Sequence, residues 1–154
     1  FMPEIKGILG KHLIGEPPKE EDELRNTDLI VLKMEPVRIA CRIRRPRRGY
    51  WERYRNQITI RTSRPSGTDT ELSKIMKGWG DYLFYGHSNL DEKTLRGWVL
   101  GDLEKFRNWH ERETIMTNKA LWVTQKNGDL SSIFRGYYWR RIDGFVVAHN
   151  INVS

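Results

Sequence analysis

Cysteine is almost absent from this sequence. Cys41 is the single one in 154 residues, which excludes an internal disulfide and a zinc site made of cysteines. The four histidines, His12, His87, His110 and His149, lack the spacing of metal ligands, so a histidine metal site is not expected. No apolar run approaches the roughly 18 to 20 residues of a membrane helix, and no signal-peptide pattern opens the chain. We therefore expect a cytoplasmic protein without a membrane partner.

Lysine and acidic residues are scarce in one segment, residues 38–64. This segment contains ten arginines, no lysine and a single acid, Glu52, whereas acids and bases nearly cancel elsewhere in a chain of net charge +7. Arginine holds phosphate oxygens in a bidentate way and stacks on bases, while lysine offers a point charge. The segment therefore predicts a polyanionic partner, most simply DNA or RNA.

The arginine-rich segment begins next to a pair of predicted strands. Leu29–Met34 is a short, nearly continuous apolar run, and Val37–Ile43 alternates between apolar and polar residues after a turn. Because side chains alternate along a strand, one face of the second strand should carry Arg38, Arg42 and Arg44. The same alternation is typical of a hairpin with one buried face and one solvated basic face, so it does not by itself require a nucleic acid.

Apolar periodicity and turn residues predict the remaining elements. Helices are expected over Pro3–Ile14, Thr70–Lys77 and Leu103–Ile115, and strands over Gln57–Ser63, Asp81–His87, Gly97–Leu103, Ala120–Thr124, Ile133–Arg141 and Phe145–Ala148. An Asn127-Gly128 turn predicts a hairpin near the C-terminus. Residues 45–55 are expected to form a basic, aromatic loop, and Trp79 and Phe84 are expected in the core or at its margin.

This order of elements predicts an α/β protein of the α+β type, with a mixed central sheet flanked by helices. The first three strands, over residues 29–34, 37–43 and 57–63, are expected to form an antiparallel meander, from which a helix crosses to the fourth strand. A single domain is expected over residues 3–150, with a C-terminal β-hairpin extension at about 118–150.

Two dipeptides stand at the openings of predicted strands. Thr27-Asp28 precedes the first apolar strand, and Asp81-Tyr82 opens the fourth. With the order helix, three strands, helix and strand, this resembles the restriction-endonuclease-like nucleases, the PD-(D/E)xK superfamily. The resemblance covers residues 3 to 110. It implies a restriction-endonuclease-like core and a divalent-metal-dependent endonuclease that cleaves phosphodiester bonds in DNA.

The family's acid-x-lysine pair is replaced here by Arg42-Ile43-Arg44, so the motif is degenerate or has migrated. Some members of the superfamily carry the second acid on the helix after the third strand, where this chain has Glu71. The resemblance therefore implies Asp28 and Glu71 as ligands of Mg²⁺ or Mn²⁺, with Arg44 and Arg42 stabilising phosphate charge. An acid in the first turn of a helix is also favoured by the helix dipole alone.

Two other functions would use the same residues. A catalytically inactive nucleic-acid-binding protein could share the fold, and an interaction subunit could present its arginines and Trp51 to an acidic protein. If the protein is a nuclease or an inactive nucleic-acid-binding protein, the expected partner is DNA in duplex, branched or single-stranded form. A homodimer is compatible with all three hypotheses. The residues predicted to contact nucleic acid are Arg38, Arg42, Arg44, Arg45, Arg47, Arg48, Trp51, Arg53, Arg55, Arg61 and Arg64.

Overall fold

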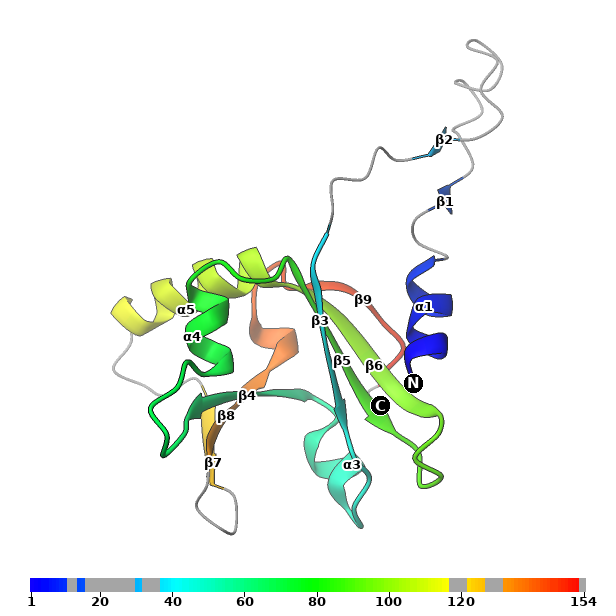
Figure 1. Ribbon diagram of the computed structural model, residues 1–154, viewed down its shortest axis with the longest axis horizontal. Helices are drawn as coiled ribbons and strands as arrows, with labels where there is room; N and C mark the ends of the chain where they lie inside the picture. The colour runs from blue at the N-terminus through cyan, green and yellow to red at the C-terminus, as the bar shows by residue number, and fades with distance from the viewer. Residues whose placement is uncertain (11–13, 16–29, 32–36, 117–121, 127–131, 153–154) are drawn as a thin grey trace. The chain divides into compact units, whose positions relative to one another are not determined.

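The computed structural model describes residues 1–10, 14–15, 30–31, 37–116, 122–126 and 132–152 (Figure 1). The chain divides into two compact units, Phe1–Pro36 and Val37–Ser154, and each is described here by itself. The first unit contains three described elements, which are helix α1 (Met2–Gly10) and strands β1 (Ile14–Gly15) and β2 (Ile30–Val31). The two strands pair antiparallel, with Ile14 opposite Val31.

The predicted hairpin between residues 29–34 and 37–43 is wrong for the residues that the structure describes. Strand β2 pairs with β1, whereas β3 (Ile39–Arg44) pairs with a strand that lies 43 residues further along the chain. The predicted meander is also wrong, because β3 and β4 (Gln57–Ser63) belong to different sheets. Alternation indicates which side chains share a face of a strand, but it does not identify the neighbouring strand.

The first sheet of the second unit has four strands in the order β3-β5-β6-β9. Strand β5 (Tyr82–Ser88) lies parallel to β3, and β6 (Leu95–Asp102) lies antiparallel to β5. Strand β9 (Val146–His149) pairs antiparallel with β6 and closes the far edge. The three strands predicted over residues 81–87, 97–103 and 145–148 are thus confirmed.

The second sheet has three antiparallel strands in the order β4-β8-β7. Strands β7 (Trp122–Lys126) and β8 (Ile133–Tyr138) form the predicted C-terminal pair, while the Asn127-Gly128 turn lies outside the described residues. Strand β8 is the central strand, since β4 pairs along its other edge with Ile58 opposite Tyr137. The fold class is therefore α+β, with two sheets in this unit in place of one central sheet.

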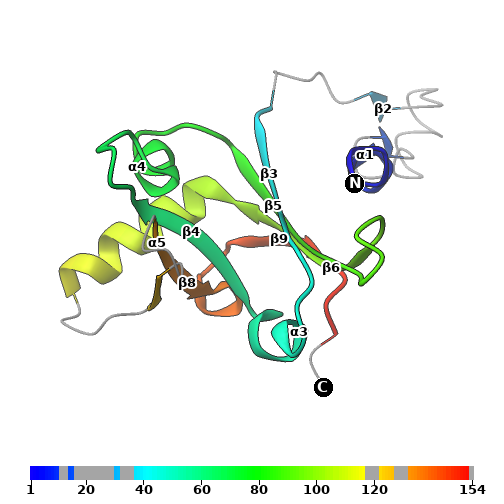
Figure 2. The same ribbon diagram turned by 60° about the horizontal axis from the view of Figure 1, so that its bottom comes forward.

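Among the described residues, four helical segments accompany the two sheets. They are α3 (Tyr50–Tyr54), α4 (Glu71–Met76), α5 (Leu103–Met116) and the 3₁₀ turn η1 (Trp139–Arg141). The Thr70 hydroxyl caps α4 by accepting from the Ser73 N–H at 3.2 Å. Helix α4 lies beside α5 in both ribbon views, and α3 stands between the end of β3 and the start of β4 (Figures 1 and 2). Part of the predicted loop over residues 45–55 is therefore the short helix α3.

The core fills the space between the two sheets and α5. Its buried members come from both sheets and from the helix, and they include Ile58, Ile60, Leu83, Tyr85, Val99, Leu103, Phe106, Trp109, Tyr137, Trp139 and Phe145. At Gly101 an added Cβ would collide with the Phe145 ring, so β6 approaches that ring more closely than any side chain would allow. Two sheets and a helix thus share one apolar interior.

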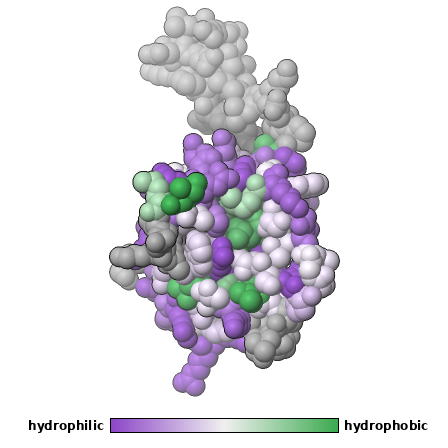
Figure 3. Space-filling model, turned by 90° about the vertical axis from the view of Figure 1, so that its left-hand side faces the viewer, coloured by the Kyte–Doolittle hydropathy of each residue, from purple (hydrophilic) through white to green (hydrophobic). Residues whose placement is uncertain are grey.

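Phe84 is fully buried and stacks on Trp98 with ring centroids 5.6 Å apart, as predicted for a core residue. The same prediction is wrong for Trp79, whose side chain follows Gly78 in the connection after α4 and is 65% exposed. The face drawn in Figure 3 is mainly hydrophilic, with apolar colour in small separate patches. Among the described helices, none has the length and apolarity needed to cross a bilayer.

Candidate functional site

A basic cleft lies between β3 of the first sheet and the strands of the second. It has a volume of about 510 Å³ and is lined by Arg42, Ile43, Arg44, Arg45, Arg47, Tyr50, Tyr54, Thr59, Tyr85, Gln125, Lys126 and Phe134. Five of these residues are cationic, and no carboxylate is among the described residues that line it. We call this the basic cleft. The positive charge of the lining residues repels cations and attracts an anion that is long enough to contact several of them.

The alternation of β3 is the reason that Arg42 and Arg44 enter the cleft together. They stand two residues apart and lie side by side with Tyr85 and His87 of β5, because the parallel register sets Arg42 against Tyr85 and Arg44 against His87. The sequence prediction of one shared face is therefore correct for Arg42 and Arg44. That face points toward the second sheet and is half-buried, in contrast to the solvated basic face of a simple hairpin.

Glu71, at the start of α4, holds the arginine at one end of the cleft. Its Oε2 atom accepts from Arg42 Nη1 in an ion pair and from the Arg61 backbone N–H at 3.1 Å. The guanidinium groups of Arg42 and Arg61 both lie over the Phe134 ring, each 5.2 Å from its centre. The two strands that carry these arginines do not pair, so packing on one aromatic ring brings them together.

Arg44 lies deeper in the cleft and is held by an aromatic ring. Its guanidinium carbon is 3.9 Å from the centre of the Tyr54 ring, and Nη2 donates to Gln125 Oε1 at 3.4 Å. The Nη1 atom is buried and has no hydrogen-bond partner. A desolvated guanidinium N–H without an acceptor is costly, so an anionic acceptor that reached this atom would be bound favourably.

Tyrosines of α3 extend this stacking along the loop. The Arg44 and Arg47 guanidinium groups lie 5.4 and 5.6 Å from the centre of the Tyr50 ring, and Arg53 lies 5.4 Å from that of Tyr54. The two tyrosine rings meet edge to face at 5.2 Å. A guanidinium that places its flat face on a ring keeps its N–H groups in plane and free to donate.

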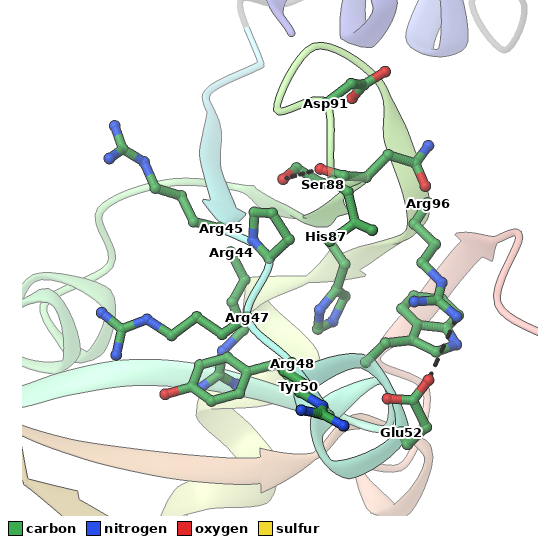
Figure 4. A pocket seen from close by; sticks show the side chains of 15 residues that line it. Arg44, Arg45, Arg47, Arg48, Tyr50, Glu52, His87, Ser88, Asp91 and Arg96 are labelled. Carbon is green, nitrogen blue, oxygen red and sulfur yellow. Dashed lines mark hydrogen bonds and ion pairs between the residues drawn. The ribbon is translucent and has the colours of Figure 1, made fainter.

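A second cavity, of about 760 Å³, adjoins the basic cleft and shares Arg44, Arg45 and Arg47 with it. Figure 4 shows the His87 ring between the Arg47 and Tyr50 side chains on one side and the Arg96 side chain on the other. We call this the His87 pocket. Its charged lining consists of five arginines and two acids, namely Arg44, Arg45, Arg47, Arg48, Arg96, Glu52 and Asp91.

His87 is held neutral by its surroundings. Burial lowers the pKa of His87 to about 4, and the positive charges of Arg44 and Arg96 add to the effect. The imidazole packs edge to face against Trp51 and Tyr85, with centroid distances of 5.5 Å in both cases. Its Nε2 atom is buried and has no hydrogen-bond partner, as is the case for Arg44 Nη1 nearby.

Trp51 is placed by a glycine of the neighbouring strand. An added Cβ at Gly97 would lie 2.5 Å from the Trp51 ring, so the glycine allows the indole to approach β6 closely. Another neighbour of the indole, besides His87, is the Arg96 guanidinium, 4.6 Å from the ring centre. Trp51 was predicted to contact nucleic acid, and the structure places it as a half-buried wall of the His87 pocket.

The remaining predicted contact residues lie at several places. Arg45 and Arg48 are exposed and line the His87 pocket, whereas Arg64 is exposed and lines a separate hollow beside Trp79. Arg38 is exposed and pairs with Asp81 at 3.4 Å, and its backbone and side chain lower the pKa of that carboxyl. For the half-buried Arg55, the carbonyl accepts from the Trp139 indole at 3.0 Å.

The predicted metal site rests on two acids, of which Asp28 lies outside the described residues. Glu71, the other, is occupied by Arg42 and by the Arg61 N–H, so a Mg²⁺ ion at Glu71 would stand beside a guanidinium. As the described residues are arranged, Glu71 does not fit a magnesium ligand. Among the described residues no group of three or more His, Cys, Asp or Glu is placed to hold a metal ion.

Several residues of this region were not predicted from the sequence. His87 and Arg96 line the His87 pocket, and Gln125 and Lys126 line the basic cleft from β7. The sequence signal for His87 is a histidine near the end of a mostly apolar and aromatic strand, where an ordinary buried face would carry an aliphatic residue. No comparable signal marks Lys126, because its position depends on the pairing of β7 with β8.

This chain matches no protein-family model, and neither the curated proteins nor the solved structures give a significant match.

Proposed function

We propose that this protein binds nucleic acid and that the phosphate backbone of the strand lies in the basic cleft. The observation that carries the proposal is the lining of the cleft, which brings Arg42, Arg44, Arg45, Arg47 and Lys126 to one hollow without a described carboxylate between them. A row of cations of this kind suits a polymer with a negative charge at each nucleotide. The DNA partner predicted from the sequence is retained, and RNA is tested beside it.

The stacking of the arginines supports phosphate contact in particular. The guanidinium carbons of Arg44 and Arg47 lie 3.9 and 5.6 Å from the centres of the Tyr54 and Tyr50 rings, and these contacts restrict the two side chains before a ligand arrives. Ordering of long side chains is one of the entropic costs of binding, and stacking removes part of that cost in advance. Base-edge recognition is not part of the proposal, because phosphate contacts orient a strand and do not read its sequence.

The first test is the salt dependence of binding. Fluorescence anisotropy with labelled duplex and single-stranded oligonucleotides, as DNA and as RNA, would be measured over a series of NaCl concentrations. Arg42 is paired with Glu71 in a half-buried contact, whereas Arg45 forms only an exposed pair with Glu92 at 3.8 Å, which water screens. Arg44, Arg45, Arg47 and Lys126 are therefore counted as phosphate contacts. Four contacts predict a slope of log K against log salt of about −3.6 for duplex DNA and about −2.8 for a single strand.

Two double variants that remove the same charge distinguish binding in the cleft from attraction to the net positive charge of the protein. Arg45→Gln with Arg47→Gln removes two exposed cations of the cleft and should lower the magnitude of the duplex slope by about two. The control, Lys105→Gln with Arg141→Gln, removes the same charge from exposed positions that line neither cavity, and it should leave the slope nearly unchanged. Equal effects of the two pairs would contradict a specific cleft. No binding of any nucleic acid at low salt would overturn the proposal and favour an acidic protein as partner.

Phosphodiester cleavage, which the resemblance to restriction-endonuclease-like nucleases implies, stays a prediction beside this proposal. Its acids are Asp28, outside the described residues, and Glu71, which the structure pairs with Arg42. Cleavage of duplex, single-stranded and branched DNA would be assayed with Mg²⁺ and with Mn²⁺. Loss of cleavage in both Asp28→Asn and Glu71→Gln, with binding retained, would support the nuclease. Binding without cleavage of any substrate would support the inactive alternative.

A further inference from the structure

Two buried nitrogens of the His87 pocket have no hydrogen-bond partner, and the residues that carry them lie on neighbouring strands. His87 Nε2 comes from β5 and Arg44 Nη1 from β3, and the parallel register sets these two residues side by side. His87 is 5% exposed, so its imidazole has given up nearly all contact with water. Leaving a buried polar group unpaired costs stability, so a ligand that reached this pocket and paired with these two nitrogens would recover that cost.

The charge around these nitrogens gives the sign of the ligand. Five arginines line the pocket, and its two acids are already engaged. Glu52 accepts from Arg96 at 3.5 Å, and Asp91 accepts from the backbone N–H groups of Lys93 and Thr94 at 2.9 and 3.1 Å. The pocket therefore offers mostly N–H donors and an excess of positive charge, which suits a compact anion with several oxygen acceptors.

We propose that the His87 pocket binds a phosphomonoester, with His87 and Arg44 at its floor and Arg47 and Arg96 at its mouth. A phosphomonoester carries close to two negative charges at neutral pH and three terminal oxygens, so it can accept from several donors at once. Two sources supply this group: the terminal phosphate of a nucleic-acid strand in the basic cleft, or a free mononucleotide. The strand-end form rests on the proposed function, whereas the mononucleotide form does not.

The shape of the pocket agrees with this ligand. Its volume of about 760 Å³ exceeds that of a phosphate, so a nucleoside attached to the phosphate has room. The sharing of Arg44, Arg45 and Arg47 with the basic cleft means that a strand lying in the cleft can end in the pocket. Arg47 and Arg96 are exposed, and long exposed side chains reorient within nanoseconds, so they can admit a ligand to the shielded floor (Figure 4).

The charge state of His87 provides a readout that does not depend on any activity. His87 is neutral in the free protein because burial and the facing charges of Arg44 and Arg96 lower its pKa to about 4. A bound phosphate brings negative charge to the same ring and favours the imidazolium. Binding should therefore raise the pKa of His87 and shift its ring resonances in NMR spectra.

The first experiment is an NMR titration of the full chain in phosphate-free buffer, with inorganic phosphate, AMP and adenosine as probes. Inorganic phosphate and AMP should shift the His87 ring resonances and raise its pKa, and adenosine should do neither. His149 serves as an internal reference, since its side chain lies outside both cavities. An unchanged His87 pKa with saturating phosphate and AMP would overturn the proposal.

The second experiment distinguishes the two sources. Anisotropy would be measured with one short oligonucleotide carrying a 5′-phosphate, a 3′-phosphate or hydroxyls at both ends. One additional charge-assisted contact predicts about tenfold tighter binding of the matching phosphorylated strand, and His87→Gln should reduce that preference while leaving the hydroxyl strand unaffected. The control Arg141→Gln should preserve the preference.

Each outcome has one meaning. A terminal-phosphate preference that His87→Gln removes supports the strand-end source, and a His87 shift with AMP but no preference between strands supports a mononucleotide. If no oligonucleotide binds while AMP still shifts His87, the proposed nucleic-acid function fails and the phosphate pocket stands. If oligonucleotides bind equally and neither phosphate nor AMP moves His87, the pocket proposal fails and the nucleic-acid function stands.

Discussion

Protonation of His87 should make the stability of this protein depend on pH below neutrality. The pKa of His87 is about 4 in the folded chain, whereas an unfolded chain has the ordinary value of 6.5. Between these two values the unfolded state binds more protons than the folded state, so the free energy of unfolding must fall as the pH falls. The contribution of His87 is complete above about pH 6.5 and is lost as the pH approaches 4.

The size of the effect follows from the shift. At 1.36 kcal/mol for each pKa unit, the full difference corresponds to roughly 3 kcal/mol, and most of it is lost by about pH 4.5. This free energy needs little reduction for screening by water, because burial is the main cause of the lowered pKa and His87 is only 5% exposed. Several kcal/mol is a large part of the total stability of a domain of this size.

The assay is urea unfolding followed by tryptophan fluorescence in phosphate-free buffers from about pH 7.5 to pH 4.5, on the natural chain and on His87→Gln. The variant removes the titration but keeps an amide near the position of Nε2. His110 also has a pKa lowered by burial, and its contribution is present in both proteins and cancels in the comparison. A variant with the same slope of stability against pH as the natural chain would refute the placement of a neutral, buried His87.

Three further predictions concern packing and charge. Phe84→Ala should destabilise the fold by about 3 to 5 kcal/mol, because a fully buried ring is lost. Trp79→Ala removes an exposed ring and should change stability by less than about 0.5 kcal/mol. Similar urea midpoints for the two variants would contradict these placements. Gly97→Ala should displace the Trp51 ring and cost about 1 to 3 kcal/mol, with a change in tryptophan emission, and an unchanged spectrum would refute that contact. Glu71→Gln removes the carboxylate that pairs with Arg42, and it should tighten oligonucleotide binding about two- to threefold at low salt. Weaker binding would show instead that the ion pair holds Arg42 in the position that binding requires.

The sequence alone predicted the local structure of most of the described residues of the second unit. Strict alternation gave the shared face of Arg42 and Arg44, and apolar periodicity gave α5 and strands β5, β6 and β9. These features depend on neighbours within a few residues, where side-chain periodicity and the backbone geometry of helices and strands are sufficient. The concentration of arginine in residues 38–64 was likewise visible without a structure.

Only the tertiary structure decided which strands meet. The sequence predicted that β3 would pair with the strands before and after it, and β3 instead pairs with β5, while β4 joins β8. Alternation is the same for every choice of partner, so a pattern of single residues contains no information about pairing over forty or eighty positions. The exposure of Trp79 was missed for a similar reason, since its environment depends on the turn after α4.

The two cavities also arise from packing over long separations in sequence. The positive charge of Arg42, Arg44 and Arg47 is evident from the sequence. The cleft that these arginines line is completed by Phe134, Gln125 and Lys126, which belong to the second sheet. His87 becomes a neutral, buried group because Trp51 and Tyr85 pack around it and two arginines face it. Composition therefore predicts an anionic partner, and the fold determines where such an anion could approach, because charge is a property of residues and a cavity is a property of their arrangement.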